Sequence, residues 1–193
     1  VDLGAGLAGV LRLDQTGMQA QLTQHRQGPE DRDPVAGGVL EQPEHPLPLA
    51  PRPPESSPPA AFPFAGRHVG YADLVETRLA QGRFFDGPCA AWFRLRHALV
   101  DGETPSVYQR VAVAADSGNG ISAILDFSKY LFLNSDLTIN LLRRPHGEWI
   151  CLDAHTHLGP EGCGLTASRL FDTQGLIGTA TQSLSLRQRD AAP

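Results

Sequence analysis

Between residues 69 and 187 the chain alternates apolar and polar residues over long stretches, and one helical segment interrupts this alternation. A period of two is typical of strands that bury a single face. Six strands are predicted on this basis, over residues 71–79, 90–97, 130–143, 148–157, 165–171 and 177–187.

The helical segment follows Thr104 and Pro105, which suit the N-cap and the first helical position. Its predicted buried stripe contains Val107, Val111, Ala114 and Ala115. The glycine-containing turn at residues 118–120 is expected to end it. Because the strands have short connections, antiparallel neighbours are favoured. We therefore predict an α+β fold in which one long antiparallel sheet packs against one helix.

Three polar residues fall where the pattern is otherwise apolar. Ser135 and Gln182 lie on the apolar faces of predicted strands, and Asp116 lies in the last helical turn, where the macrodipole disfavours a carboxylate. A polar side chain among core residues costs free energy unless it is hydrogen-bonded or does chemistry. These positions are candidates for function. Structural readings also fit them: a hydroxyl bonded to backbone, a satisfied core amide and a solvated helix end.

Composition limits the functional class. A formal charge of −5 with scattered arginines argues against a nucleic-acid-binding protein. No apolar run approaches the length of about 20 residues that crosses a bilayer, and no signal peptide is visible, so no membrane contact is expected. Cys89, Cys151 and Cys163 are too widely spaced for a disulfide framework or a metal site. We expect them to be reduced, buried thiols of a cytoplasmic protein.

The chain divides into three parts by composition. Residues 34–63 hold ten of the sixteen prolines. Because proline lacks an amide donor and disfavours helix before it, a flexible linker is predicted over residues 34–66. The folded domain is predicted over residues 67–190. Residues 1–33 alternate weakly between Leu11 and Leu22, which fits the last hairpin of a preceding domain.

A second motif suggests metal binding. Alternation places Asp153, His155 and His157 on one strand face, where two imidazoles could share an ion. A His-x-His pair of this kind opens metal-dependent barrels of about 250 residues. Only roughly three dozen residues follow His157 here. We therefore interpret the motif as a solvated or inter-domain strand face and expect no metal.

Several ordered segments resemble the thioesterase-like superfamily, which has the hotdog fold. They are residues 71–78 (YADLVETR), 91–96 (AWFRLR), 115–120 (ADSGNG), 132–138 (FLNSDLT), 144–149 (RPHGEW), 171–175 (FDTQG) and 181–184 (TQSL). Over residues 67–187 the chain is similar to the C-terminal half of acyl-CoA thioesterase II, which carries two hotdog domains in tandem. The resemblance implies a sheet wrapped around a central helix. It also implies that the first hotdog is absent, or present only as a tail in residues 1–33.

The resemblance further implies acyl-CoA hydrolysis. Asp116 matches the family's catalytic aspartate, Gln182 its glutamine on the last strand, and Ser135 the position of its threonine. Asn134 and Asp136 flank Ser135 and would replace it if the register shifts by one. Asp116 would be the general base for a water that Ser135 and Gln182 orient beside the carbonyl. This route needs no covalent intermediate, metal or cofactor, since coenzyme A arrives with the substrate.

The alternative is a non-catalytic hotdog module that binds acyl groups or a partner protein. Tandem hotdogs bury a shared face, so we expect a homo-oligomer or packing against another hotdog domain. The acyl chain is expected in an apolar tunnel between helix and sheet, or at a domain interface. Arg143 and Arg144 either contact the phosphates of coenzyme A or form a solvated strand end.

Overall fold

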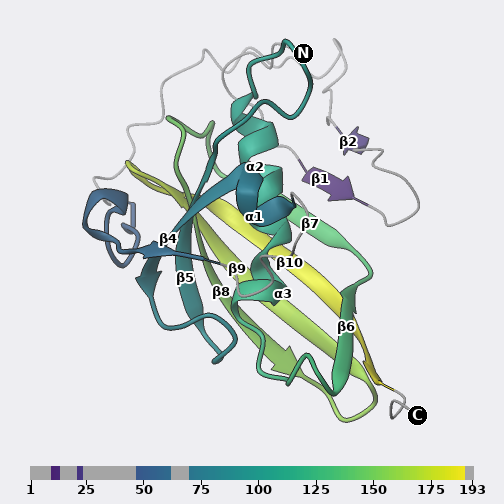
Figure 1. Cartoon of the computed structure of the whole chain (residues 1–193). Helices are drawn as coiled ribbons and strands as arrows, with labels where there is room; N and C mark the ends of the chain where they lie inside the picture. The colour runs from purple at the N-terminus through teal and green to yellow at the C-terminus, as the bar shows by residue number, and fades with distance from the viewer. Residues whose placement is uncertain (1–9, 14–20, 24–46, 62–69, 190–193) are drawn as a thin grey trace.

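The computed structural model describes residues 10–13, 21–23, 47–61 and 70–189. A long, curled antiparallel sheet forms the body of the molecule, and helices α2 (Val107–Asp116) and α3 (Gly118–Ile121) follow each other along its inner face (Figure 1). The predicted α+β architecture of one sheet around one main helix is confirmed.

The sheet has the strand order β2-β1-β7-β10-β9-β8-β5-β4-β3, with antiparallel pairs throughout. Strand β6 lies off this path and pairs with the C-terminal half of β10. The bounds are β1 Val10–Leu13, β2 Gln21–Thr23, β3 Pro59–Ala60, β4 Val75–Gln81, β5 Cys89–Leu95, β6 Tyr130–Asn134, β7 Leu137–Leu141, β8 Ile150–Leu158, β9 Cys163–Asp172 and β10 Gly175–Gln188. Strands β1 and β2 pair with each other, and β1 also pairs with β7, so the two strands extend the sheet at this edge.

Helix α2 begins later than Thr104 and Pro105 suggest. Ser106 is the N-cap, and its hydroxyl accepts a hydrogen bond from the amide of Gln109 at 3.2 Å. The Gln109 side chain accepts in return from the Ser106 amide at 2.7 Å, which completes a capping box. The turn expected to end the helix instead forms α3. The expected stripe is buried at Val111, Ala114 and Ala115.

The segment predicted as a strand over residues 71–79 is a strand only in part. Tyr71–Leu74 forms the short helix α1, and β4 starts at Val75. The side chain of Asp73 accepts from the amide of Gly70 at 2.8 Å and so caps the free end of this turn. Alternation alone does not reveal this capping.

The strand predicted over residues 130–143 is broken in two at Ser135 and Asp136. Asn134 pairs with Leu184 and Thr138 pairs with Thr181, so four steps along one strand oppose three along β10. This mismatch is a β-bulge with one extra residue. Along a regular strand, every second residue faces the same side of the sheet, a rule here called parity. Because of the bulge, parity counted from β7 gives the wrong face for the residues of β6.

The main core lies between the helices and the inner face of the sheet. A second cluster lies on the outer face and contains Ala80, Ala90, Trp92, Cys151 and Phe171. Of the cysteines, Cys89 and Cys151 are buried as expected, and burial raises the pKa of the Cys89 thiol to about 12. Cys163 is exposed, contrary to expectation, because it begins β9 beside a turn.

Residues 47–61, part of the predicted flexible linker, pack on the sheet and are here called the strap. The carbonyl of Arg52 accepts a hydrogen bond from Trp92 Nε1 at 2.7 Å. The carbonyls of Pro48 and Pro58 each accept from a sheet amide at 2.9 Å. Proline lacks a donor but keeps its acceptor, so a proline-rich segment can still bind a sheet through its carbonyls. Within the described ranges, no helix is long and apolar enough to span a membrane.

Candidate active site

Asp116 and Asn134 meet where α2 ends and β6 ends. Asp116 is the last residue of α2 and is exposed. Its Oδ1 accepts a hydrogen bond from Asn134 Nδ2 at 3.0 Å. Asn134 closes β6 on the inner face, where it pairs in register with Leu184. Helix and strand thus hold a carboxylate and an amide side by side at the surface.

Gln182 lies beneath the same helical junction, and its side chain is almost fully buried, at 1% exposure. Its Oε1 accepts from the amide of Asn119 at 3.0 Å, and its Nε2 donates to the carbonyl of Asp116 at 3.2 Å. Gln182 therefore ties together the end of α2 and the start of α3. An amide nitrogen carries two protons, so a second donor is left for another partner.

Gly118 makes this contact sterically feasible. A Cβ at this position would lie 2.6 Å from Gln182 Oε1 and 3.1 Å from Ser168 Oγ. Both distances are shorter than ordinary van der Waals contact, so a larger residue would displace the buried amide. The glycine thus allows the helix backbone to approach β9 and β10 closely.

Ser135 faces a different partner. It is exposed, and its Oγ donates to the carbonyl of Ser183 at 3.2 Å. The neighbouring Asp136 accepts from the amide and the hydroxyl of Ser183, both at 2.9 Å. The structure thus brings Asp116, Asn134 and Gln182 together and places the Ser135 hydroxyl away from them. The extra residue of the bulge is the reason that parity did not identify Asn134.

Tyr71 is a site neighbour that the sequence reasoning missed. Its hydroxyl donates to the carbonyl of Val113 at 2.9 Å and lies 2.8 Å from Ser117 Oγ. Burial raises the pKa of Tyr71 to about 12; the hydrogen bond to Ser117 lowers it, and the charge of Asp116 adds to the increase. Tyr71 therefore braces the last turn of α2, which carries Asp116. Its segment was expected to be a strand, which concealed this role.

A row of buried polar residues crosses the inner face below α3. Thr156, Thr166 and Gln182 are register neighbours on β8, β9 and β10. The hydroxyls of Thr156 and Thr166 lie 2.8 Å apart, and Ser122 Oγ lies 2.7 Å from Thr156 Oγ1. Ser122 Oγ also donates to the carbonyl of Gly118 at 2.8 Å. The Ser122 hydroxyl therefore links the end of α3 to the sheet, because it bonds both the Gly118 carbonyl and Thr156.

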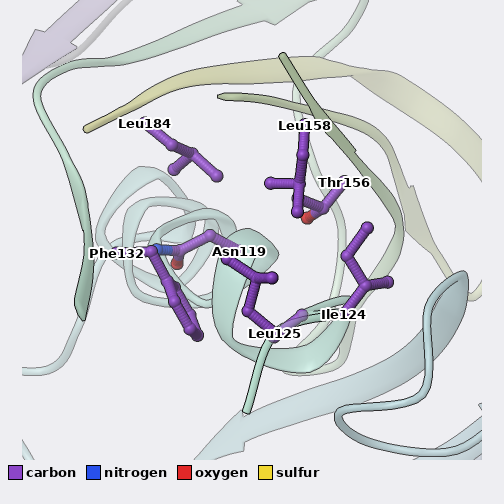
Figure 2. Close-up of a pocket in the computed structure, with 8 residues that line it drawn as sticks. Asn119, Ile124, Leu125, Phe132, Thr156, Leu158 and Leu184 are labelled. Carbon is purple, nitrogen blue, oxygen red and sulfur yellow. The ribbon is translucent and has the colours of Figure 1, made fainter. Parts of the chain in front are cut away.

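A small, mostly apolar cavity adjoins the site. Figure 2 shows its walls closing around a central space, with Phe132 and Leu184 on one side and Leu158 and Ile124 on the other. Its volume is about 10 Å³. The lining residues are Asn119, Ala123, Ile124, Leu125, Phe132, Thr156, Leu158 and Leu184.

The outer face of the sheet carries the residues of the His-x-His motif. His155 and His157 are exposed, with ring centroids 4.0 Å apart, as strand alternation predicts. The carboxylate of Asp153 pairs instead with Arg169 at 2.5 Å. This face therefore presents an ion pair and two solvated imidazoles.

Arg143 is engaged inside the domain. Its guanidinium donates to both carboxylate oxygens of Asp172 at 2.6 Å. Burial alone would raise the pKa of Asp172, but these bonds, with those from the amides of His146 and Gln174, hold it below its usual value. Contact with coenzyme A phosphates therefore does not fit Arg143, whereas Arg144 is exposed.

Solved structures of other proteins share this fold. The structure resembles the crystal structure of an acyl-CoA thioesterase II, TesB2, from Mycobacterium marinum, with a TM-score of 0.58 and 16% identity over 98% of this chain and 83% of that one. It also resembles a protein of unknown function with a hotdog fold from Alicyclobacillus acidocaldarius, with a TM-score of 0.55 and 14% identity over 100% of this chain and 81% of that one. These likenesses establish the hotdog fold.

A search of curated protein sequences finds no match. The family model described as the acyl-CoA thioesterase C-terminal domain matches residues 51–186, which is well over half of the chain. The matched range includes most of the strap, the helices and the sheet from β3 to nearly the end of β10, whereas β1 and β2 lie outside it. The chain therefore belongs to the acyl-CoA thioesterase C-terminal domain family.

Proposed function

We propose that this domain hydrolyses an acyl-CoA thioester, with Asp116 as the general base. The observation that carries the proposal is the 3.0 Å hydrogen bond from Asn134 Nδ2 to Asp116 Oδ1, in a domain of the thioesterase family. The bond fixes the carboxylate while the exposure of Asp116 leaves lone pairs for a water. A positioned carboxylate of this kind is suited to general-base catalysis.

In the proposed reaction Asp116 removes a proton from a water as its oxygen attacks the thioester carbonyl carbon. The carbon–sulfur bond then breaks, and the proton passes from Asp116 to the departing coenzyme A sulfur. The products are a free acid and coenzyme A. Asn134 holds the carboxylate, and Gln182 keeps the helical junction in place while its second amide proton is available to the water or the carbonyl.

In this proposal Asn134 takes the orienting role that the family resemblance implies for Ser135. The Ser135 hydroxyl would have to leave the carbonyl of Ser183 before it could serve the water. An amide can donate to Asp116 while presenting its own carbonyl oxygen, so it substitutes for a hydroxyl that both donates and accepts. Parallel Asn134→Ala and Ser135→Ala variants test this choice. We expect Asn134→Ala to lower kcat by roughly 10–100-fold and Ser135→Ala to have little effect.

The decisive experiment measures thiol release from a panel of acyl-CoAs with the parent chain and Asp116→Asn. We expect release from the parent and a loss of about 10²–10⁴-fold in the variant. Asp101→Asn, at an exposed loop residue of the same charge, is the matched control and should behave as the parent. An active Asp116→Asn protein would show that another group is the base.

A binding module without turnover is the second candidate. Two observations favour it: the helix backbone engages both polar ends of the Gln182 amide, and the adjoining cavity measures only about 10 Å³. If a folded parent binds acyl-CoA but releases no thiol, this candidate replaces the hydrolase.

The proposal includes self-association or packing against another hotdog domain. Leu133 and Leu142 are exposed at 56% and 61%, close to the strands that flank the site. Burial of such side chains in an interface is favourable. Size-exclusion chromatography with light scattering should therefore give a mass above that of one chain, and a clean monomer would contradict this part. The cytoplasmic location inferred from reduced cysteines belongs to the same proposal.

A further inference from the structure

The small cavity is lined by neighbours of the Asp116–Asn134 pair, although neither member of the pair lines it. Phe132 and Asn134 lie on the same face of β6, two residues apart, and Leu184 pairs in register with Asn134 while lining the cavity. Asn119 also lines the cavity, and its backbone amide donates a hydrogen bond to Gln182 Oε1. Figure 2 labels both Asn119 and Phe132 among the residues that surround the space. These shared neighbours make the cavity a candidate site for the first part of an acyl chain whose carbonyl lies at Asp116.

The lining is suited to hydrocarbon, because six of its eight residues are apolar. Its volume of about 10 Å³ corresponds to one water-sized group at most. Protein interiors are close-packed, so a longer apolar chain enters only if a wall side chain moves. The residue that resists this movement sets the chain length.

Phe132 is the wall residue with the firmest support behind it. Its ring centroid lies 4.3 Å from that of Phe127, which lies 4.8 Å from that of Phe85 in an edge-on contact. The three rings therefore form one continuous aromatic cluster, of which Phe132 lines the cavity. Contact with Phe127 restricts the movement of the Phe132 ring.

Phe85, at the far end of this aromatic cluster, has an unusual backbone conformation. Phe85 has a φ of 63°, in the left-handed region that bulky residues rarely adopt. Its amide donates to the carbonyl of Ile121 at 3.2 Å, and the amide of Gly87 donates to the carbonyl of Ala123 at 3.3 Å. The loop that carries Phe85 is thus bonded to the segment that forms another wall of the cavity.

We propose that Phe132, backed by Phe127 and Phe85, is a specificity-determining residue that restricts the acyl group to short chains. This inference rests on the proposed function, since it takes the Asp116–Asn134 pair as the point where the carbonyl sits. Truncation of Phe132 opens the cavity and admits longer chains. One methylene in a hydrophobic pocket changes discrimination by about tenfold or more.

The test compares kcat/KM for acetyl-, butyryl-, hexanoyl-, octanoyl- and palmitoyl-CoA in the parent and in Phe132→Ala. We expect the parent to prefer the short substrates, and the ratio of octanoyl to butyryl turnover to rise about tenfold or more in the variant. Leu99→Ala is the matched control, because Leu99 is an exposed apolar residue, at 42%, that does not line the cavity. Its profile should equal that of the parent. A parent that favours palmitoyl-CoA, or an unchanged profile in Phe132→Ala, overturns the proposal.

Two further measurements separate this proposal from the proposed hydrolysis. Phe127→Leu removes the support and leaves Phe132 in place, so it should shift the profile in the same direction by a smaller factor. Dissociation constants of the same acyl-CoAs are measured on Asp116→Asn protein with and without Phe132→Ala. If no parent substrate releases thiol but binding follows chain length and shifts with Phe132, hydrolysis fails and the specificity assignment stands. If binding is indifferent to length, the assignment fails.

Discussion

Asp116 and Asp172 each lie at the end of a secondary-structure element, yet their surroundings are opposite. Asp172 ends β9, has a fully buried side chain and accepts hydrogen bonds from both Arg143 nitrogens and from the amides of His146 and Gln174. Asp116 ends α2 and is exposed, and within the described part of the chain Asn134 is the one side chain that donates to it. A saturated carboxylate stabilises the fold, whereas an open one can accept a proton.

Asp172→Asn should cause the largest loss of stability. Removal of one partner from a buried ion pair leaves the other uncompensated, at a typical cost of about 3–5 kcal/mol. We expect the lower end, because the Arg143 side chain is 22% exposed. Urea denaturation measures the free energy of unfolding directly. A loss below about 1 kcal/mol would show that the pair is not a structural anchor.

The Arg143–Asp172 ion pair also makes the free energy of unfolding of the parent chain depend on pH. The folded pKa of Asp172 is lowered from 3.8, so its stabilising contribution is present above that value and is lost as the pH falls toward the folded pKa. Unfolding free energies measured from neutral pH to pH 3 should therefore fall more steeply for the parent than for Asp172→Asn. Equal slopes would contradict this assignment.

Gly118→Ala comes next and tests the junction that carries Asp116. The added methyl group would collide with Gln182 Oε1, and overpacking of this kind typically costs about 1–3 kcal/mol. Thiol release should fall with it, because the displaced amide no longer holds the carbonyl of Asp116. Gly120→Ala is the control, since nothing lies within 4 Å of a Cβ there. Equal losses in both variants would point to a general effect on the helix.

Trp92→Phe weakens the strap without touching the site. The variant keeps the ring in the outer cluster but leaves the carbonyl of Arg52 without the indole donor, which typically costs about 1 kcal/mol. Thermal unfolding should shift down by a few degrees, while kcat/KM remains that of the parent. A large change in activity would mean that the outer face communicates with the junction.

Asp116→Asn should have the smallest effect on stability, in contrast to its effect on catalysis. Exposed substitutions away from special features usually change stability by no more than about 0.5 kcal/mol. Asparagine retains an oxygen that can accept from Asn134. Urea denaturation of the variant used for the activity assay provides the measurement. A strong destabilisation would make Asp116 structural, like Asp172, and would remove the contrast between them.

The sequence was sufficient to predict the sheet and the helix, because alternation and helical spacing are local patterns that burial enforces. It was also sufficient to place Gln182 on the inner face, since β10 pairs regularly with β9 around that residue. It could not place Ser135, because a bulge shifts parity without a clear local signal. The strap was predicted to be part of a flexible linker, but it packs on the sheet. The prolines indicate that backbone hydrogen-bond donors are missing, and they do not indicate where the backbone carbonyls bind. The catalytic roles remain predictions.

The bulge at residues 135 and 136 means that chain length, as well as residue type, encodes the chemistry presented to a substrate. If the extra residue lay one position earlier in the strand, Ser135 would replace Asn134 beside Asp116 at the end of α2. Neither side chain would need to change. Comparisons of related domains should be aligned on strand pairing, since aligning on identical letters would match residues that face opposite sides of the sheet.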